Sequence, residues 1–221
     1  MTLSAVVPTL NAAATLASTL DSLQGADEVV VSDGGSTDGT IDIARRLGAR
    51  VVNSLSGRGR QLVAGAAEAK GEWLLFLHAD TVLDADWRKL VDRHISDTAN
   101  HGRAAAFRFA LDDGSRSAKR LEQMVAWRNK VFALPYGDQG LLIKRDFYES
   151  LGGFRPLPLM EDVDFVRRIG RRRLLILPLA ARTSAARWRE QGWTARSLRN
   201  VMCLSLYFVG VPPRLILRLY S

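Results

Sequence analysis

Short apolar runs and helical repeats of hydrophobic residues alternate along the first half of the chain. The apolar runs are too short for buried helices and predict strands at residues 3–7, 28–32, 50–52, 73–77 and 104–109. Apolar residues at three- and four-residue spacing predict intervening helices at residues 12–23, 38–47, 60–70 and 86–95. This alternation predicts an α/β domain with a mostly parallel central sheet and helices on both faces.

The pattern is less regular after residue 110. We expect short strands at 141–143 and 174–177, and helices at 117–132, 161–169, 194–209 and 213–220. The last two form an apolar helical C-terminus. Because no long Pro-, Gly- or Ser-rich segment divides the chain, we expect residues 1–221 to form a single domain.

Polar residues follow three of the predicted strands. Asn11 follows the first strand, Asp33 the second and Asp80 the fourth. Ligands of open α/β sheets bind at the carboxyl ends of strands, so these side chains indicate a site. Each also has a simpler interpretation: Asn11 as the cap of the first helix, Asp33 as part of a tight turn with Ser36 or Asp38 as a cap, and Asp80 as the cap of a turn.

The predicted site lacks the glycine-rich loops that commonly bind phosphate, since neither G-x-G-x-x-G nor G-x-x-x-x-G-K-[ST] occurs. A carboxylate-rich site needs a cation to hold a diphosphate. Asp80 is therefore the expected ligand of a hard divalent metal, Mg²⁺ or Mn²⁺, with His78 as a second candidate. His78 could instead be a core histidine.

A second pair of acids begins the helix predicted at 161–169. The helix dipole favours ionised Glu161 and Asp162 at this position. An ionised carboxylate can accept a proton from a hydroxyl, which makes Asp162 a candidate general base with Glu161 beside it. Complementarity to the dipole alone would also explain both acids.

The net charge of +8 is unevenly distributed. Residues 166–221 carry twelve arginines against one acid, Glu190, for a net +11, and residues 1–165 carry −3. A basic C-terminal quarter suggests an anionic partner: a diphosphate, a membrane surface or nucleic acid. A solvated arginine-rich face is the alternative.

Two features favour a cytoplasmic location. The N-terminal residues lack a basic region and a long apolar run, and the apolar stretch 201–211 is shorter than the roughly 20 residues of a spanning helix. The single cysteine, Cys203, fits a reducing compartment and lies in an apolar run typical of a buried thiol. Arginines flanking the apolar C-terminal helices suggest peripheral contact with the inner membrane face, or alternatively a homodimer interface.

With these residues in view, the chain resembles family 2 glycosyltransferases of GT-A fold over residues 3 to 170. The resemblance rests on five motifs in order: Val6-Val7-Pro8-Thr9-Leu10-Asn11, Ser32-Asp33-Gly34-Gly35-Ser36-Thr37-Asp38-Gly39, Gly57-Arg58-Gly59-Arg60-Gln61, Leu77-His78-Ala79-Asp80 and Glu161-Asp162. His78 stands where the family's D-x-D metal motif has its first acid.

The resemblance implies a Rossmann-like domain that transfers a sugar from a nucleotide-diphosphate donor, with inversion at the anomeric carbon. Residues 1–110 would bind the donor, 111–180 the acceptor, and 181–221 would form a basic, apolar helical tail. The implied donor-site residues are Pro8, Thr9, Asn11, Asp33, Arg58, Ala79 and Asp80. Asp80 would bind the metal, and Asp162 would be the general base. Arg182 or Arg187 could bind the diphosphate as a charge-assisted fork.

The acceptor is not identified by any motif, and a lipid-linked acceptor would suit the C-terminal helices. Three other functions stay open: a catalytically inactive nucleotide-sugar-binding module, a nucleotidyltransferase of similar fold, and a nucleic-acid binder. The Pro8–Asn11 segment argues against the nucleotidyltransferase, which needs a glycine-rich loop there. The nucleic-acid binder would need exposed aromatics such as Trp188 and Trp193 among the arginines.

Overall fold

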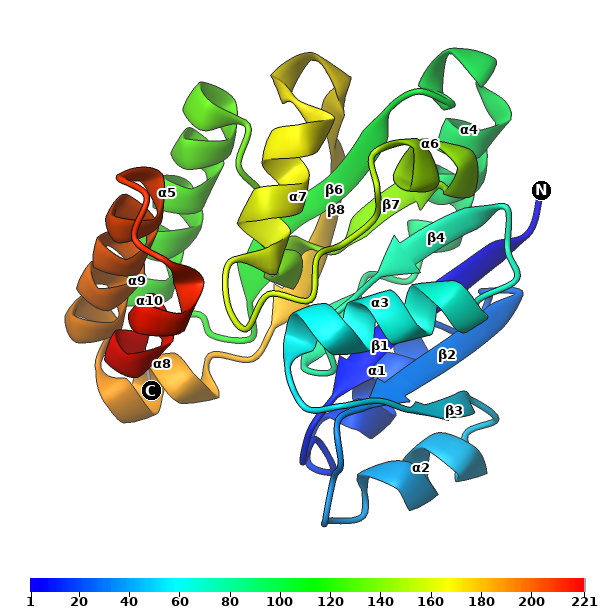
Figure 1. Cartoon of the computed structure of the whole chain (residues 1–221), viewed down its shortest axis with the longest axis horizontal. Helices are drawn as coiled ribbons and strands as arrows, with labels where there is room; N and C mark the ends of the chain where they lie inside the picture. The colour runs from blue at the N-terminus through cyan, green and yellow to red at the C-terminus, as the bar shows by residue number, and fades with distance from the viewer. Residues whose placement is uncertain (221) are drawn as a thin grey trace.

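An eight-stranded sheet forms the centre of the computed structural model, which describes residues 1–220 (Figure 1). Its strand order is β3-β2-β1-β4-β7-β6-β8-β5. The strands are β1 (Leu3–Thr9), β2 (Glu28–Asp33), β3 (Arg50–Asn53), β4 (Trp73–Phe76), β5 (Thr81–Leu83), β6 (Ala104–Leu111), β7 (Leu141–Lys144) and β8 (Leu174–Thr183).

The sheet is parallel in its N-terminal half and mixed beyond it. β1 pairs in parallel with β2 and β4, and β2 with β3, as the strand–helix alternation predicted. β7 then lies between β4 and β6 and is antiparallel to both. The outer pairs are β6 with β8, which is parallel, and β5 with β8, which is antiparallel. The single α/β domain expected from the sequence is thus confirmed, with an antiparallel insertion at β7.

The helices occupy most of the predicted positions. They are α1 (Leu16–Ser22), α2 (Thr40–Arg46), α3 (Arg58–Glu68), α4 (Trp87–Ser96), α5 (Arg116–Phe132), α6 (Arg145–Ser150), α7 (Glu161–Ile169), α8 (Ala186–Gln191), α9 (Trp193–Phe208) and α10 (Pro213–Tyr220), with 3₁₀ turns η1 (Thr98–Asn100), η2 (Gly137–Gln139) and η3 (Arg171–Arg173). The sequence pattern did not predict α6 and α8, which are too short to show a helical repeat.

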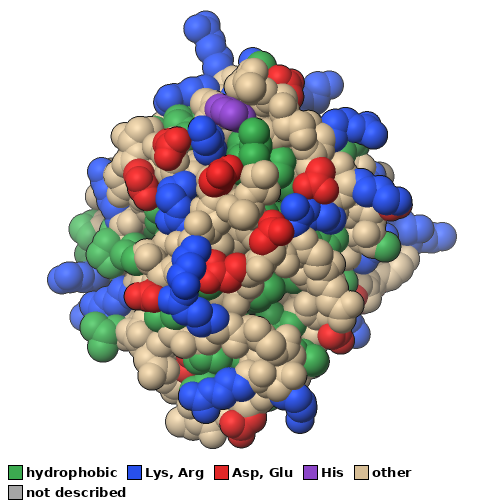
Figure 2. Space-filling view, turned by 90° about the vertical axis from the view of Figure 1, so that its right-hand side faces the viewer, with side chains coloured by type: hydrophobic (Ala, Val, Ile, Leu, Met, Phe, Trp, Pro, Cys, Tyr) green, Lys and Arg blue, Asp and Glu red, His purple; other side chains and the backbone are tan. Residues whose placement is uncertain are grey.

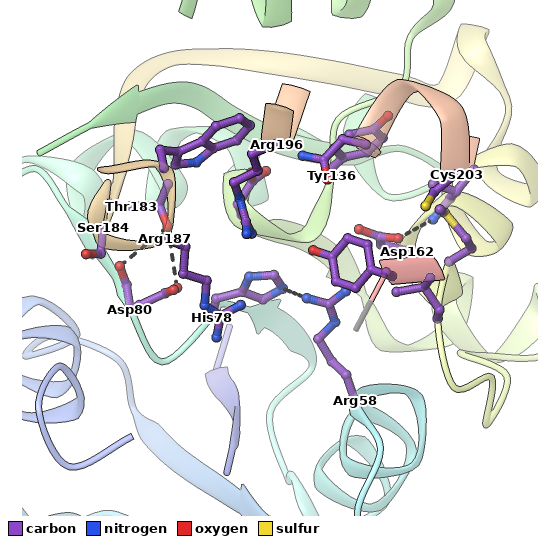
Figure 3. Close-up of a pocket in the computed structure, with 17 residues that line it drawn as sticks. Arg58, His78, Asp80, Tyr136, Asp162, Thr183, Ser184, Arg187, Arg196 and Cys203 are labelled. Atoms are coloured by element: carbon purple, nitrogen blue, oxygen red, sulfur yellow. Dashed lines mark hydrogen bonds between the residues drawn. The ribbon is translucent and has the colours of Figure 1, made fainter. Parts of the chain in front are cut away.

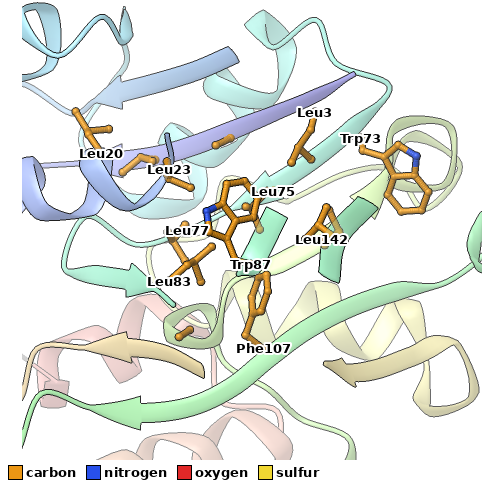
Figure 4. Close-up of a cluster of buried hydrophobic side chains, with 14 of the residues drawn as sticks. Leu3, Leu20, Leu23, Trp73, Leu75, Leu77, Leu83, Trp87, Phe107 and Leu142 are labelled. Atoms are coloured by element: carbon orange, nitrogen blue, oxygen red, sulfur yellow. The ribbon is translucent and has the colours of Figure 1, made fainter. Parts of the chain in front are cut away.

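Alternate residues of the central strands bury side chains on opposite faces of the sheet. On β4, Leu75 packs with α1 and α4, whereas Leu74 and Phe76 pack with α3, α6 and α7. The first face is centred on two large buried rings, Trp87 of α4 and Phe107 of β6 (Figure 4). Burial on both faces explains why the strands read as continuous apolar runs.

Close packing of α3 on the sheet depends on Gly65. A Cβ atom at this position would collide with Val6 Cγ1 of β1 and come within 3.2 Å of Ser32 Cβ of β2. The helix therefore lies directly on β1 and β2, which fixes the N-terminus of α3 beside the carboxyl ends of these strands.

The two ends of the molecule differ in their surfaces. α8, α9 and α10 gather beside α5 at the end of the molecule opposite β3 and α2 (Figure 1), where α5, α9 and α10 carry several exposed apolar side chains. Figure 2 shows the side of the molecule that faces away from these C-terminal helices, and there basic and acidic side chains are interspersed. Within residues 1–220, every helix is too short or too polar to cross a membrane.

Candidate functional site

A cavity of about 120 Å³ lies where the carboxyl end of β4 meets the C-terminal helices. Six regions of the chain contribute to its wall: α3, the β4–β5 loop, η2, the start of α7, the end of β8 and the helices α8 to α10 (Figure 3). Asp80 and Asp162, 82 positions apart in the sequence, approach it from opposite sides, with His78 and Arg58 between them. The predicted metal ligand and the predicted base therefore share one cavity.

The β4–β5 loop and the end of β8 position Asp80. Its Oδ1 accepts hydrogen bonds from the hydroxyl groups of Thr183, at 3.4 Å, and Thr81, at 3.5 Å. Thr81 and Thr183 face each other in the antiparallel β5–β8 pair. Within residues 1–220, no hydrogen bond reaches Asp80 Oδ2, so this oxygen is free to bind a ligand.

His78 is neutral and packs against Arg58. Burial, followed by the positive charge of Arg58, lowers the pKa of His78 to about 3. The Arg58 Nη1 atom lies 3.4 Å from His78 Nε2, which as the neutral ring nitrogen accepts this contact. A Cβ atom on Gly137 would lie 2.5 Å from the same Nε2 atom, so the ring also needs a glycine at this position.

The adjacent acids of α7 have different environments. Glu161 is buried, forms an ion pair with Arg58 and lies outside the lining of this cavity. Burial raises the pKa of Glu161, and the pKa of Arg58 is raised because Glu161 and Asp162 outweigh the effect of its own burial. Asp162 lines the cavity, so of the two predicted catalytic carboxylates it is the one exposed to a ligand.

Hydrogen bonds hold the Asp162 carboxylate in place. Oδ2 accepts from the backbone N–H of Gly137 at 2.9 Å, and Oδ1 accepts from the N–H of Val163 at 2.8 Å. Each oxygen retains a second lone pair. Asp162 can therefore stay oriented while it accepts a proton.

A third aspartate, Asp138 on η2, lines the same cavity. Burial raises the pKa of Asp138 to about 6; the charges of Asp162 and Asp80 raise it further, while Arg128 and Arg58 oppose the increase. Its Oδ1 is shielded from solvent and has no hydrogen-bond partner among the described residues. We did not predict this residue, although its Gly-Asp-Gln-Gly setting before a strand was visible in the sequence.

The C-terminal segments supply the rest of the wall. Arg187 and Trp188 come from α8, and Arg196 stacks on Trp188 with its Cζ 5.1 Å from the ring centroid. The other lining residues that motif reasoning missed are Tyr136, Leu159, Met160, Val163, Thr183, Ser184, Asn200, Cys203 and Tyr220. Cys203 is buried, as predicted.

The two arginines proposed for diphosphate binding lie in different places. Arg187 lines the cavity. Arg182 is half exposed on β8, and its Nε pairs with Asp84 Oδ1 at 3.0 Å outside the lining of the cavity. The structure therefore brings Arg187, but not Arg182, to the predicted acids.

The ends of β1 and β2 are joined by a compact polar turn. Both Asp33 oxygens are used: Oδ1 accepts from the hydroxyls of Thr9, at 2.8 Å, and Ser36, and Oδ2 accepts from the N–H groups of Gly35 and Ser36. These bonds lower the pKa of Asp33 even though burial opposes them. A nucleotide contact by Asp33 would have to replace or share one of these bonds.

Asn11 lies in the same turn with a positive φ of 51°, a conformation that asparagine tolerates. Its Oδ1 accepts from the Thr37 N–H at 2.9 Å, linking β1 to the β2–α2 loop. Asn11 does not cap α1, because Thr15 occupies that N-cap position, and Gly39 is the N-cap residue of α2. The Asp38 side chain nevertheless accepts from the N–H of Thr40, the first residue of α2, and Asp33 forms the tight turn that was its simpler interpretation. Pro8 pairs with Ser32 in the sheet, and Ala79 packs against the core beside Asp80. None of Pro8, Thr9, Asn11 and Asp33 lines the cavity around Asp80, so their donor contacts stay predictions.

The donor atoms fit a divalent ion that is only partly held by protein. Among residues 1–220, no group of three or more His, Cys, Asp or Glu side chains is arranged to enclose a metal. Asp80 offers an open carboxylate oxygen, whereas the acceptor nitrogen of neutral His78 already contacts Arg58, so Asp80 is the better placed of the two predicted ligands. Mg²⁺-type ions commonly take one or two carboxylates and complete their shell with phosphate oxygens and water, which suits this arrangement.

Comparison with known proteins agrees with the motifs. The model of glycosyl transferase family 2 matches residues 4–155. A PGL/p-HBAD biosynthesis glycosyltransferase of Mycobacterium tuberculosis is 43% identical over 91 residues, or 36% of each chain. Glycosyltransferase AglJ of Haloferax volcanii is 31% identical over 156 residues, which cover 68% of this chain and 48% of AglJ. The matched segments thus span less than half the length of these relatives.

Solved structures share the fold. Glucosyl-3-phosphoglycerate synthase of Mycobacterium tuberculosis, in complex with Mn²⁺, UDP-glucose and phosphoglyceric acid, superposes with a TM-score of 0.59 at 25% identity, over 81% of this chain and 70% of the synthase. TarS of S. aureus superposes with a TM-score of 0.65 at 19% identity, over 93% of this chain and 40% of TarS, which shows a shared fold alone. Because the family model covers more than half of the chain, the protein belongs to glycosyl transferase family 2.

Proposed function

We propose that this protein transfers a sugar from a nucleotide-diphosphate donor to a hydroxyl group of an acceptor, with inversion at the anomeric carbon. The observation that carries the proposal is the placement of Asp80 and Asp162 on opposite sides of one cavity (Figure 3). Direct displacement needs the leaving group and the attacking hydroxyl on opposite faces of the sugar, and this placement supports that arrangement.

In the proposed step, Asp162 accepts the proton of the acceptor hydroxyl group while the oxygen of that hydroxyl group forms a bond to the anomeric carbon. The bond between that carbon and the diphosphate oxygen breaks, and a nucleoside diphosphate leaves. Arg187, on the Asp80 side of the cavity, would stabilise the negative charge on the diphosphate. A divalent ion held by Asp80, with His78 beside it, would neutralise further charge on the leaving group. The Mn²⁺ and UDP-glucose bound to glucosyl-3-phosphoglycerate synthase support this choice of donor and metal.

The test measures release of nucleoside diphosphate from a panel of nucleotide sugars with Mn²⁺, Mg²⁺ or EDTA. We expect metal-dependent release that falls on the order of 100-fold in Asp80→Asn and in Asp162→Asn, because each removes a group that acts in the transition state. Asp162→Asn should still bind nucleoside diphosphate. Asp84→Asn is the matched control, since Asp84 pairs with Arg182 outside the cavity.

The same experiment separates the competing functions. Binding of a nucleotide sugar without turnover in any metal would favour the inactive binding module. A nucleotidyltransferase would release pyrophosphate from a nucleoside triphosphate instead. The nucleic-acid binder is the weakest candidate because Trp188 and Trp193 are half-buried and stacked on each other, with ring centroids 6.1 Å apart.

We also propose that the protein works in the cytoplasm and touches anionic membrane through α9 and α10. Leu198, Leu215 and Leu219 are exposed there, close in sequence to Arg199, Arg214 and Arg218. Sedimentation with phosphatidylglycerol vesicles should be weakened by high salt and by Leu215→Asp. Equal sedimentation with neutral vesicles, or none with either, would contradict this contact.

A further inference from the structure

A second cavity, of about 650 Å³, opens between α5 and α9. Its wall is mainly apolar, with Met124, Trp127 and Phe132 from α5 facing Val201 and Phe208 from α9. All five side chains are between 47% and 60% exposed. A monomeric protein seldom leaves a contiguous apolar surface of this kind uncovered without a binding function.

The second cavity adjoins the catalytic cavity. Tyr136, Asp138, Trp188 and Asn200 line both. A ligand that fills the apolar cavity would therefore end beside Asp138, in the wall that also contains Asp162. Its volume falls within the range of about 300–1,000 Å³ that is usual for small-molecule sites.

Charged groups in the second cavity lie at the boundary with the catalytic cavity. Of its described lining residues, only Arg128 and Asp138 carry charge. The Arg128 Cζ atom is 3.5 Å from the centroid of the Tyr136 ring, which belongs to the shared wall. The site thus suits a molecule with an apolar body and a polar end directed at the catalytic cavity.

The Oδ1 atom of Asp138 is a specific candidate contact for the polar end of such a ligand. This oxygen is shielded from solvent and lacks a hydrogen-bond partner among residues 1–220, although buried carboxylate oxygens are usually paired. A hydroxyl group entering from the apolar cavity could donate to it. The same hydroxyl would then lie in the cavity lined by Asp162.

From this geometry we infer that the acceptor is a hydrophobic alcohol or phenol, whose apolar body occupies the α5–α9 cavity and whose hydroxyl reaches the catalytic cavity. This inference rests on the proposed transferase activity, and it names the chemical class of the acceptor. A membrane surface or a second copy of the chain covering α5 and α9 are the competing occupants.

The test uses n-alkyl β-glucosides of six, eight and ten carbons, below their micelle concentrations, as probes with an apolar chain and free hydroxyls. Binding is followed by tryptophan fluorescence, since Trp127 and Trp188 line the cavity. We expect affinity to rise roughly fourfold per methylene as the chain is buried. An affinity independent of chain length would overturn the inference.

A matched pair of variants locates the probe. Val201→Asp puts a charge in the cavity wall, whereas Leu198→Asp puts the same charge one helical turn earlier, at an exposed residue outside the lining. We expect at least tenfold weaker probe binding in Val201→Asp and no change in Leu198→Asp. Equal effects in both variants would contradict the proposed site.

Two further readouts separate this inference from its alternatives. If nucleoside diphosphate fails to bind the wild type while alkyl glucosides bind with the expected chain dependence, the proposed function fails and the cavity assignment stands. If Val201→Asp instead dissolves a dimer in sedimentation velocity, or abolishes vesicle binding, without changing probe affinity, a second copy or a membrane covers the cavity and the inference is wrong.

Discussion

Asp138 of η2 lines both the catalytic cavity and the α5–α9 cavity. It lies three positions before β7, and its electrostatic environment includes Asp80, Arg128 and Asp162 from three other parts of the chain. Burial raises its pKa to about 6 from the usual 3.8, so ionisation of this carboxyl opposes folding. The cost is absent well below pH 3.8, grows between pH 3.8 and about 6, and stays constant at higher pH.

Asp138→Asn should therefore stabilise the metal-free protein selectively at high pH. Relative to wild type, we expect the variant to gain up to about 3 kcal/mol in unfolding free energy between pH 4 and pH 8. Urea unfolding in EDTA at both pH values measures this. A difference between the two proteins that does not vary with pH would show that the carboxyl ionises freely.

Arg182 and Arg187 were equally good candidates for diphosphate binding from the sequence, but only Arg187 lines the catalytic cavity. Arg187→Gln should weaken binding of nucleoside diphosphate roughly tenfold or more, because a charge-assisted contact in the cavity is lost. Arg182→Gln should change the affinity less than twofold, since Arg182 pairs with Asp84 at an exposed site. Calorimetric titration of both variants decides between them, and equal losses would contradict the assignment.

At the scale of elements, α3 connects the core to the site. Gly65 lets the helix lie against β1, Gln61 bonds to the carbonyl oxygens of Thr9 and Ser32, and Arg58 at its N-terminus reaches Glu161 and His78. The packing of α3 on the sheet therefore determines where Arg58 lies in the wall of the cavity.

Gly65→Ala should lift α3 from the sheet. We expect a loss of about 1–3 kcal/mol in unfolding free energy, the usual cost of overpacking a core. Gly102→Ala is the control, because a Cβ atom there meets no heavy atom within 4 Å. Chemical denaturation of both variants measures the difference. Equal stability of Gly65→Ala and Gly102→Ala would contradict the close approach seen here.

At the scale of the whole molecule, the catalytic cavity joins the parallel sheet to the C-terminal helices. Asp80 follows the central strand β4, whereas Asn200 and Tyr220 come from α9 and α10. A ligand bound in this cavity should therefore stabilise both parts together, because it binds only the folded arrangement.

Nucleoside diphosphate with Mn²⁺ should raise the melting temperature of the whole chain. At a concentration one hundred times Kd, the added stability is about 2.7 kcal/mol. Calorimetry should show this shift with both ligands present and a much smaller one in EDTA or in Asp80→Asn. A shift of the same size without metal would argue against a metal-bridged diphosphate.

The sequence by itself determined the local structure and the main chemical groups. Apolar runs predicted β1 to β4, and spacing predicted α3, α5, α7, α9 and α10, because burial imposes a period on hydrophobic positions. The ordered motifs singled out Asp80 and Asp162, which the structure places in one cavity. The proposed tripartite division at residues 110 and 180 stays a prediction, although one sheet runs through all three parts.

Only the tertiary structure decided which distant residues meet. The antiparallel insertion of β7, the separation of Arg187 from Arg182, and the convergence of Asp138 with Asp80 depend on contacts between segments far apart in sequence. The apolar cavity between α5 and α9 is another such case, because each helix alone shows an apolar face without showing what it borders. Local patterns record whether a side chain is buried, and long-range packing determines its neighbours.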